Sequence, residues 1–306
     1  MPKHVAIVIV NWNGIADTAR CLDSVMKLKK RGVTLTTVVV DNGSTNDSVS
    51  VLRNHYPWVH CIALKHNLGF TGGNNAGMNY ALEHGADFIW LLNNDTLVHP
   101  DALSLVAAFD DKAVGVAGSK IYFAPGHEYH HDRYSASERG NVFWYAGGLV
   151  DWDNMYASHK GVDEVDHGQY DTVEQTPFIT GCSMMIRRSV AESVGFLDEH
   201  FYLYLEDLDY CLRAKARGYT LVYYPRSVVW HVNAGSTGGA GNMLHEYYIT
   251  RNRLLVGMRY APMRTKIALI RESMRFLWFG SAVKKQAIRD AMLGKWGKQY
   301  EPKKFA

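Results

Sequence analysis

Four short runs of apolar residues dominate the first hundred positions of the chain. They have the length and composition of strands buried in a parallel sheet, and they span residues 5–10, 35–40, 59–64 and 87–92. The stretches between them predict helices over residues 17–29, 47–54 and 74–84. Because strands alternate with helices, the pattern predicts an α/β fold with a mostly parallel, doubly wound sheet.

Polar residues stand where these apolar runs end. Asn11 follows the first run, Asp41 the second, and the triplet Asn93, Asn94 and Asp95 the fourth. Open α/β sheets bind ligands at the carboxyl ends of their strands, so these side chains are predicted to lie at a binding edge. The carboxylate of Asp95 suits a divalent cation held against a diphosphate, because hard cations take oxygen ligands. The alternative is that Asp95 only caps a turn.

A glycine-rich stretch at residues 66–73 follows the third strand and predicts a loop. Its glycines Gly69, Gly72 and Gly73 allow either a close approach of a ligand to the backbone or simply a tight turn. The stretch is not a Walker sequence and lacks the dinucleotide fingerprint. Beyond the fourth strand, Pro100 predicts the first turn of a further helix.

The middle of the chain, residues 124–173, has no clear periodicity and is rich in His, Tyr, Asp and Gly. Two interpretations of this region stay open. One is a zinc site formed by His127, His130, His131 and Asp132; the other is a long, solvated binding loop. The indoles of Trp144 and Trp152 either stack on a sugar or fill the core.

An acidic cluster precedes a helical pattern near position 207. Glu206, Asp207 and Asp209 fall within four residues. Acids favour the first turn of a helix, so the cluster either caps the helix or supplies a general base. The remaining elements of this half are predicted as strands at 180–187, 221–224 and 228–231 and helices at 189–194 and 207–217.

The C-terminal part, residues 243–293, predicts helices, and its charge differs from that of the rest of the chain. Residues 251–306 hold 14 Lys and Arg against 3 Asp and Glu, a net charge of +11, which leaves −8 for the rest of a chain whose total is +3. An apolar stripe runs beside the basic residues through Ile267, Ile270, Met274, Leu277 and Trp278. A basic amphipathic helix is typical of a membrane surface, and packing on the body of the protein or on a second subunit is the alternative.

Composition narrows the class of protein. Of the 306 residues, 47% are hydrophobic and 21% charged, as in an ordinary globular protein, and no apolar run is long enough to cross a membrane. The four cysteines have no CxxC spacing and predict buried thiols in a reducing compartment. The chain starts directly with a strand rather than a signal peptide, so a cytoplasmic location is expected.

Eight segments together carry a resemblance to a known family. They are VAIVIVNWNG (5–14), VVVDNGSTNDS (38–48), HNLGFTGGNNAGM (66–78), LLNNDT (91–96), GCSMMIRR (181–188), GFLDEHFYLYLEDLDYCLRAKARGY (195–219), WHVNAGST (230–237) and YYITRN (247–252). The chain resembles the family 2 glycosyltransferases of the GT-A fold, especially their rhamnosyltransferase-like bacterial branch. The resemblance implies a Rossmann-like catalytic domain over 1–242, with a nucleotide-sugar half (1–118) and an acceptor half (119–242), and a helical extension over 243–306.

The resemblance also implies roles for individual residues. Asp207 matches the catalytic base, and Asp95 and His231 match ligands of Mg²⁺ or Mn²⁺; the usual first Asp of the Asp-x-Asp triplet is replaced by Asn93, which removes a charge. The acceptor would be oriented by Glu206, Asp209 and Cys182. For Glu206 and Asp209 the alternative role is to anchor the helix. Residues that would contact the nucleotide sugar are Asn11, Asp41, Asn67, Gly69, Gly73, Asn74, Asn93 and Asn94.

The expected function is therefore the inverting transfer of a sugar to a hydroxyl of a lipid-linked or cell-surface polysaccharide precursor. The resemblance favours L-rhamnose from dTDP-rhamnose, with UDP-hexoses as the alternative donors. The helical extension over 243–306, called the tail below, would bring the enzyme to the inner face of the cell membrane or join two subunits. A nucleic-acid partner is not expected, because no helix-turn-helix or zinc-finger pattern is present.

The sequence disfavours two further classes of protein. A nucleotidyltransferase needs a glycine-rich, basic loop near the first strand, and NWNGIADTAR is not such a loop. A degenerate sugar-binding protein is disfavoured by the joint presence of Asp95, Asp207 and His231.

Overall fold

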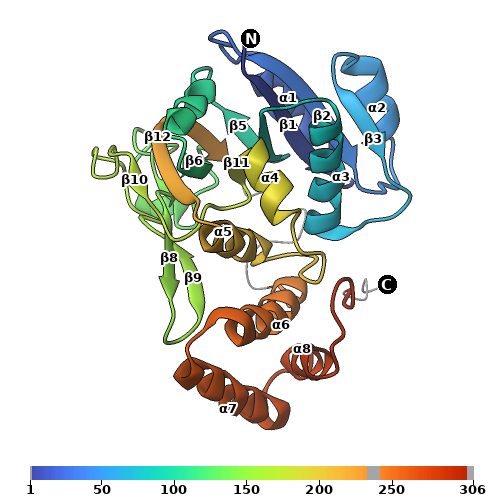
Figure 1. The fold of residues 1–306 in the computed structure, drawn as a ribbon, viewed down its shortest axis with the longest axis vertical. Helices are drawn as coiled ribbons and strands as arrows, with labels where there is room; N and C mark the ends of the chain where they lie inside the picture. The colour runs from blue at the N-terminus through green and yellow to red at the C-terminus, as the bar shows by residue number, and fades with distance from the viewer. Residues whose placement is uncertain (1, 233–241, 302–306) are drawn as a thin grey trace.

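The computed structural model describes residues 2–232 and 242–301, and a mixed sheet forms its centre (Figure 1). The strand order is β10-β12-β6-β11-β4-β1-β2-β3, with β5 beside β12 and β7 beside β6. In the N-terminal half the elements are β1 (His4–Asn11), α1 (Ile15–Val25), β2 (Thr34–Asp41), α2 (Ser48–His55), β3 (His60–Ala63), α3 (Gly69–Glu83) and β4 (Phe88–Asn93).

The N-terminal half forms a parallel sheet, as predicted. Strands β4, β1, β2 and β3 pair in parallel, and their register sets Asn11 opposite Asp41 and Val10 opposite Asn93. The central strand β1 is buried almost throughout, which explains its unbroken apolar sequence. The polar residues that end the strands therefore meet at one edge of the sheet.

The second half adds antiparallel pairing. Its elements are β5 (Thr96–Val98), η1 (Ala102–Asp110), β6 (Val114–Phe123), η2 (His131–Arg133), β7 (Phe143–Tyr145), β8 (Gly148–Asp151), β9 (Tyr156–His159), β10 (Glu174–Gln175), β11 (Ser183–Arg187), α4 (Arg188–Val194), α5 (Glu206–Ala216) and β12 (Thr220–His231). Strand β11 lies antiparallel between β4 and β6, and β12 runs parallel to β6. Strand β11 thus joins the two halves into one sheet.

Three predicted boundaries are wrong. The glycine-rich stretch is not a loop, because helix α3 begins at Gly69; an added Cβ at Gly73 would lie 2.8 Å from the Val10 side chain, so the glycine lets the helix approach β1 closely. The two strands predicted at 221–224 and 228–231 are one strand, β12, with a register shift between Tyr224 and Val228. The helix predicted at Pro100 is the 3₁₀ helix η1, which begins at Ala102.

Three helices form a group at the lower end of the molecule in Figure 1, below α5: α6 (Met243–Tyr260), α7 (Met263–Phe279) and α8 (Ala282–Met292). Helix α7 buries Thr265, Leu269 and Ser273. No helix within residues 2–232 and 242–301 has the length and hydropathy needed to cross a membrane. The segment 233–241 and the end from Pro302 lie outside the described residues.

Candidate active site

A cavity of about 430 Å³ opens at the carboxyl ends of β1 and β4. Its walls come from the strand ends, the first turn of α3, the loop before α5, strand β9 and helix α6. Most of the residues predicted for the site line this cavity: Asn67, Gly69, Asn74, Asn93, Asn94, Asp95, Cys182, Glu206, Asp207 and His231. Residues from five distant parts of the sequence are therefore brought to the sheet edge that the strand pattern predicted.

The predicted metal ligands lie side by side. Strand β5 pairs with β12 so that Thr96 is opposite His231, which brings His231 Nε2 to 3.2 Å from Asp95 Oδ1. Within the described part of the chain, no group of three or more His, Cys, Asp or Glu side chains is placed to hold a metal ion. One carboxylate and one imidazole fit a cation that takes its other ligands from a diphosphate and water, as Mg²⁺ commonly does.

The carboxylate of Asp207 is held at the start of α5. Its Oδ2 accepts a hydrogen bond from the Gly181 backbone N–H at 3.0 Å, and its Oδ1 accepts one from the Leu208 N–H at 2.8 Å. Both bonds favour the charged form, as does the N-terminus of the helix. Burial nevertheless raises the pKa of Asp207 above its ordinary value. A carboxylate that is desolvated but firmly oriented suits a general base.

Glu206 differs from Asp207 although the two are neighbours. It is 5% exposed, and its Oε2 has no hydrogen-bond partner among the described residues. Burial, together with the negative charge of Asp207, raises the pKa of Glu206 well above its ordinary value. Of the two pKa values, that of Glu206 is raised further, and only the Asp207 carboxylate accepts hydrogen bonds from Gly181 and Leu208, which favours Asp207 as the ionised member of the pair.

This assignment predicts the pH dependence of the reaction. With Asp207 in the role of base, which requires the ionised carboxylate, kcat/KM should fall on acidification, and the midpoint should lie above the ordinary aspartate pKa of 3.8. In the variant Glu206→Gln one neutral group replaces another, so the acidic limb should stay within about half a pH unit of the wild type, since one unit corresponds to about 1.4 kcal/mol of changed interaction. A pH–rate profile of both proteins measures this. If the acidic midpoint of Glu206→Gln instead lies more than one pH unit below that of the wild type, Glu206 is ionised in the wild type, because removing its negative charge would then lower the pKa of Asp207.

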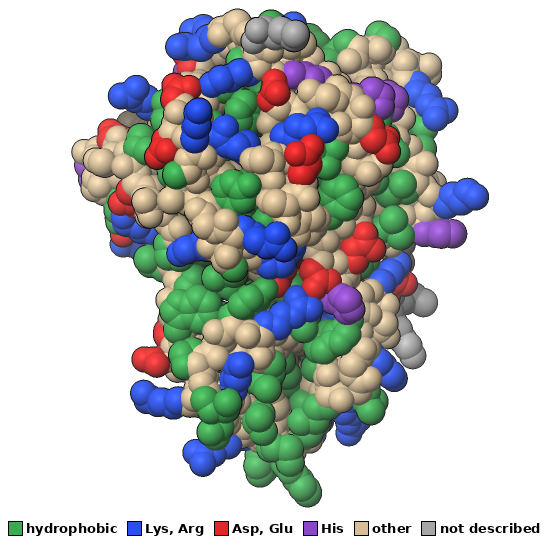
Figure 2. All heavy atoms as spheres, viewed as in Figure 1, with side chains coloured by type: hydrophobic (Ala, Val, Ile, Leu, Met, Phe, Trp, Pro, Cys, Tyr) green, Lys and Arg blue, Asp and Glu red, His purple; other side chains and the backbone are tan. Residues whose placement is uncertain are grey.

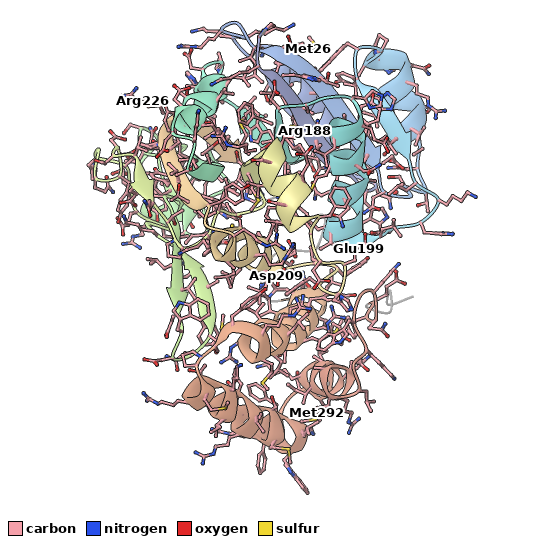
Figure 3. The ribbon with its side chains drawn as sticks, in the orientation of Figure 1. Met26, Arg188, Glu199, Asp209, Arg226 and Met292 are labelled. Atoms are coloured by element: carbon pink, nitrogen blue, oxygen red, sulfur yellow. The ribbon has the colours of Figure 1, made fainter. Side chains whose placement is uncertain are left out.

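Asp209 does not line the cavity. It lies on the side of α5 that faces α6 (Figure 3), where it accepts hydrogen bonds from Arg213 Nε at 2.8 Å, Arg259 Nη1 at 3.0 Å and the Tyr260 hydroxyl at 2.7 Å. The side chain is fully buried. Of the two roles open for Asp209 in the sequence, these contacts correspond to the helix anchor and not to the acceptor contact.

Three residues predicted to contact the nucleotide sugar lie just behind the cavity wall. Asp41 is 1% exposed, and its carboxylate accepts hydrogen bonds from Asn11 Nδ2 at 2.8 Å and from the Ser44 N–H at 2.9 Å. Asn11 is buried as well, and Gly73 packs against β1. In this structure these residues shape the edge of the site, while Asn42, which the sequence did not single out, lines it.

The irregular middle of the chain also supplies part of the wall. Trp144 lines the cavity, whereas Trp152 packs in the core. His159, unmarked by any sequence motif, lies edge-on to Trp144 with its Nδ1 3.0 Å from the Trp144 carbonyl oxygen, and burial lowers the pKa of His159 to about 4. Trp144 in turn lies edge-on to His231. A neutral histidine and an indole thus stand beside the predicted metal ligands.

The geometry defines a class of enzyme. An α/β sheet with a cavity at its strand ends, where a carboxylate–imidazole pair suited to a cation meets a separate buried carboxylate, is the arrangement expected of a GT-A glycosyltransferase. The sequence model of the family described as "Glycosyltransferase like family 2" matches residues 2–253, so the chain belongs to this family.

Individual relatives agree with this assignment. The low-salt glycan biosynthesis hexosyltransferase Agl10 of Haloferax volcanii is 26% identical over 70% of this chain and 62% of its own length. The N-acetylglucosaminyl-diphospho-decaprenol L-rhamnosyltransferase of Mycobacterium tuberculosis is 25% identical over 78% of this chain and 79% of its own. The crystal structure of GalNAc-T7 with UDP, GalNAc and Mn²⁺ has the same fold, with a TM-score of 0.63 at 16% identity over 94% of this chain and 54% of that one.

Proposed function

We propose that this protein is an inverting, metal-dependent glycosyltransferase that moves L-rhamnose from dTDP-rhamnose to a hydroxyl of a lipid-linked glycan precursor. The observation that carries the proposal is the meeting of the Asp95–His231 pair and the Asp207 carboxylate in one cavity. The choice of sugar and acceptor is supported by the mycobacterial relative, which is named for rhamnose transfer to a diphospho-decaprenol substrate.

The donor is proposed to lie along the N-terminal side of the cavity. Asn67, Asn74 and Asn94 offer amide groups to the ribose and the phosphates. Asp95 and His231 would hold Mg²⁺ or Mn²⁺, which would stabilise the negative charge of the leaving diphosphate. The Mn²⁺ and UDP in the GalNAc-T7 structure support this choice of cation.

The acceptor is proposed to enter beside α5. Asp207 takes the proton from the acceptor hydroxyl as the hydroxyl oxygen attacks the anomeric carbon, and the bond to the diphosphate breaks on the opposite side. Protonated Glu206 is suited to donate a hydrogen bond to the sugar. Cys182 lines the cavity near the acceptor as a neutral thiol, because burial raises its pKa well above the ordinary value. Since the acceptor attacks directly, the anomeric configuration is inverted.

A panel of nucleotide sugars tests this proposal. The protein is incubated with dTDP-rhamnose and with UDP-hexoses, each with a diphosphate-linked glycan acceptor, and the products are followed by mass spectrometry. We expect dTDP release and a rhamnosylated acceptor. Turnover of a UDP-hexose alone would contradict the choice of donor, and binding of donors without any turnover would indicate a sugar-binding protein.

The tail is proposed to dock on an anionic membrane surface. Four of the five apolar residues of the stripe predicted on α7 are exposed: Ile267, Ile270 and Met274 are 46–48% accessible and Trp278 is 73%, whereas Leu277 is half-buried. At 3.6 residues per turn, exposed Arg264, Arg271 and Arg275 fall along one side of this stripe, opposite the buried face of the helix. Figure 2 shows hydrophobic and basic side chains together at this end of the molecule.

Charge complementarity favours lipid over a second subunit as the partner of this surface. Apolar side chains flanked by cations suit the boundary between headgroups and acyl chains, and each basic residue near an anionic surface contributes about 1 kcal/mol. A lipid-linked acceptor is confined to that surface, so docking through α7 would raise the local concentration of acceptor at the cavity.

Vesicle flotation measures this docking. The protein should float with phosphatidylglycerol vesicles and not with phosphatidylcholine vesicles, less so in high salt, and binding should be lost when Arg264, Arg271 and Arg275 are replaced by Gln. The control replaces Lys27, Lys30 and Lys65, exposed basic residues of the N-terminal half, by Gln and should float normally. The alternative outcome is that the protein floats with neither kind of vesicle and elutes as a dimer, and that the variant Trp278→Glu is a monomer. This would show that the exposed face of α7 is a subunit interface.

A further inference from the structure

We infer that Arg251 and Asn252, on helix α6, are positioning residues that hold the loop carrying Glu206 and Asp207 in its working conformation. The inference rests on the proposed role of Asp207 as base. It makes the first helix of the C-terminal extension a part of the active site and not an accessory to it. Leu244, His245 and Ile249 of the same helix line the cavity, which places α6 at the site independently of the two residues.

The loop before α5 has an unusual backbone. Tyr202, Tyr204 and Leu205 have φ angles of 64°, 70° and 68°. This left-handed region is uncommon for residues other than glycine, and three such residues within four positions do not persist unless surrounding contacts impose them. Leu205 is the residue directly before Glu206, so its backbone angles set the direction in which the two acids leave the loop.

The side chain of Asn252, on helix α6, donates hydrogen bonds to the backbone of this loop. Its amide nitrogen lies 3.0, 2.8 and 2.9 Å from the carbonyl oxygens of Phe201, Leu203 and Tyr204. The two N–H groups of one buried amide thus serve three carbonyls of the segment that contains all three left-handed residues, so one N–H is shared between two carbonyls. The left-handed turns point these carbonyls toward a single donor, and the donor in turn stabilises the turns.

Arg251 completes the arrangement. Its Nη2 donates to the carbonyl oxygens of His200 and Phe201 at 3.0 and 2.8 Å, and its Nε donates to Asn252 Oδ1 at 2.9 Å. The bond to Oδ1 fixes the amide so that its nitrogen faces the loop. The remaining donor, Nη1, reaches the Gly297 carbonyl at 2.6 Å, which ties the segment after α8 to the same point.

Both side chains are fully buried, so their hydrogen bonds must compensate for the loss of contact with water. Arg251 and Asn252 are both 0% exposed, and the guanidinium lies between the rings of Tyr247, Tyr248 and Trp296. A buried charge is unfavourable unless it is hydrogen-bonded, and this one donates to two loop carbonyls, to Asn252 and to the Gly297 carbonyl. The neighbouring Arg253 instead contacts the carbonyls of Asn154 and Met155 and the carboxylate of Glu272, away from the loop.

The variant Asn252→Ala tests the inference, with Arg253→Gln as the matched control on the same helix. Asn252→Ala should lower kcat about 10²-fold, the size of effect expected when a catalytic group moves by about 1 Å. The dissociation constant of the donor nucleotide should change less than about twofold, because the proposed donor contacts lie in the N-terminal half and on His231 of β12, outside the loop that Asn252 holds. Arg253→Gln should keep both values, although it also removes contacts of α6.

Hydrogen exchange supplies a second measurement that does not depend on activity. In Asn252→Ala, amides of residues 201–208 should exchange faster than in the wild type and in Arg253→Gln, while amides of β1 and β4 stay protected. This separates the inference from the proposed function: inactive wild-type protein would contradict the proposed function, and unchanged exchange of the loop would still overturn the positioning role. Wild-type kcat in Asn252→Ala, or equal losses in both variants, would overturn it as well.

Discussion

Replacing Asp207 by asparagine is expected to lower kcat about 10²–10⁴-fold, the usual contribution of a general base. The substitution keeps the size of the side chain and leaves an oxygen to accept from the Gly181 or Leu208 N–H, so the fold of the site should survive. The affinity for the donor nucleotide should change little, because the donor contacts proposed here lie on Asn67, Asn74, Asn94 and the Asp95–His231 pair. Steady-state kinetics and calorimetric titration of the nucleotide give the two values.

The control for this variant is Asp153→Asn, which alters an exposed acid in the turn between β8 and β9 and should leave the rate unchanged. A rate near that of the wild type in Asp207→Asn would show that the base lies elsewhere. Glu206 would then be the next residue to test, because it lines the same cavity.

Removal of divalent cations is expected to abolish turnover, and Mg²⁺ or Mn²⁺ should restore it. Neither Lys nor Arg is among the described residues that line the cavity, so its side chains cannot by themselves neutralise the negative charge of a leaving diphosphate. The variants Asp95→Asn and His231→Asn should need higher cation concentrations for half-maximal activity. Turnover in chelator followed by cation titration measures both effects.

The matched control for the histidine variant is His55→Asn, an exposed histidine at the end of α2. It should respond to cations as the wild type does. Full activity of the wild type in excess EDTA would remove Asp95 and His231 from the role of metal ligands, and their 3.2 Å contact would then be an ordinary structural hydrogen bond.

Much of the fold follows from sequence periodicity, for a physical reason. A strand buried on both faces must be apolar throughout, so β1, β2 and β4 are visible as apolar runs, and the ends of parallel strands must meet at one edge. The start of helix α3 was wrongly predicted as a loop, because three glycines within five residues, Gly69, Gly72 and Gly73, are typical of loops. Gly73 instead lets the helix pack closely on Val10 of β1, and Gly69 packs against Tyr202, which only the three-dimensional neighbours reveal.

The sequence also predicted much of the candidate site, but not the directions in which neighbouring side chains point. The motifs led to Asp95, His231 and Asp207, which the structure brings to one cavity. Sequence proximity could not separate Glu206, which faces the cavity, from Asp209, which faces α6, because both fall in the first turn of α5. The cavity residue His159 carried no signal, since its neighbour Trp144 lies fifteen positions away across a region without periodicity.

The anomeric configuration of the product tests the central claim most directly, because it reports on the number of displacement steps. The claim is that one carboxylate, Asp207, activates the acceptor for a single attack on the nucleotide sugar. Proton NMR of the product formed by the wild-type enzyme should show the configuration opposite to that of the donor. A product with the donor's configuration would contradict the account, since two displacements or attack on the same face would then be required.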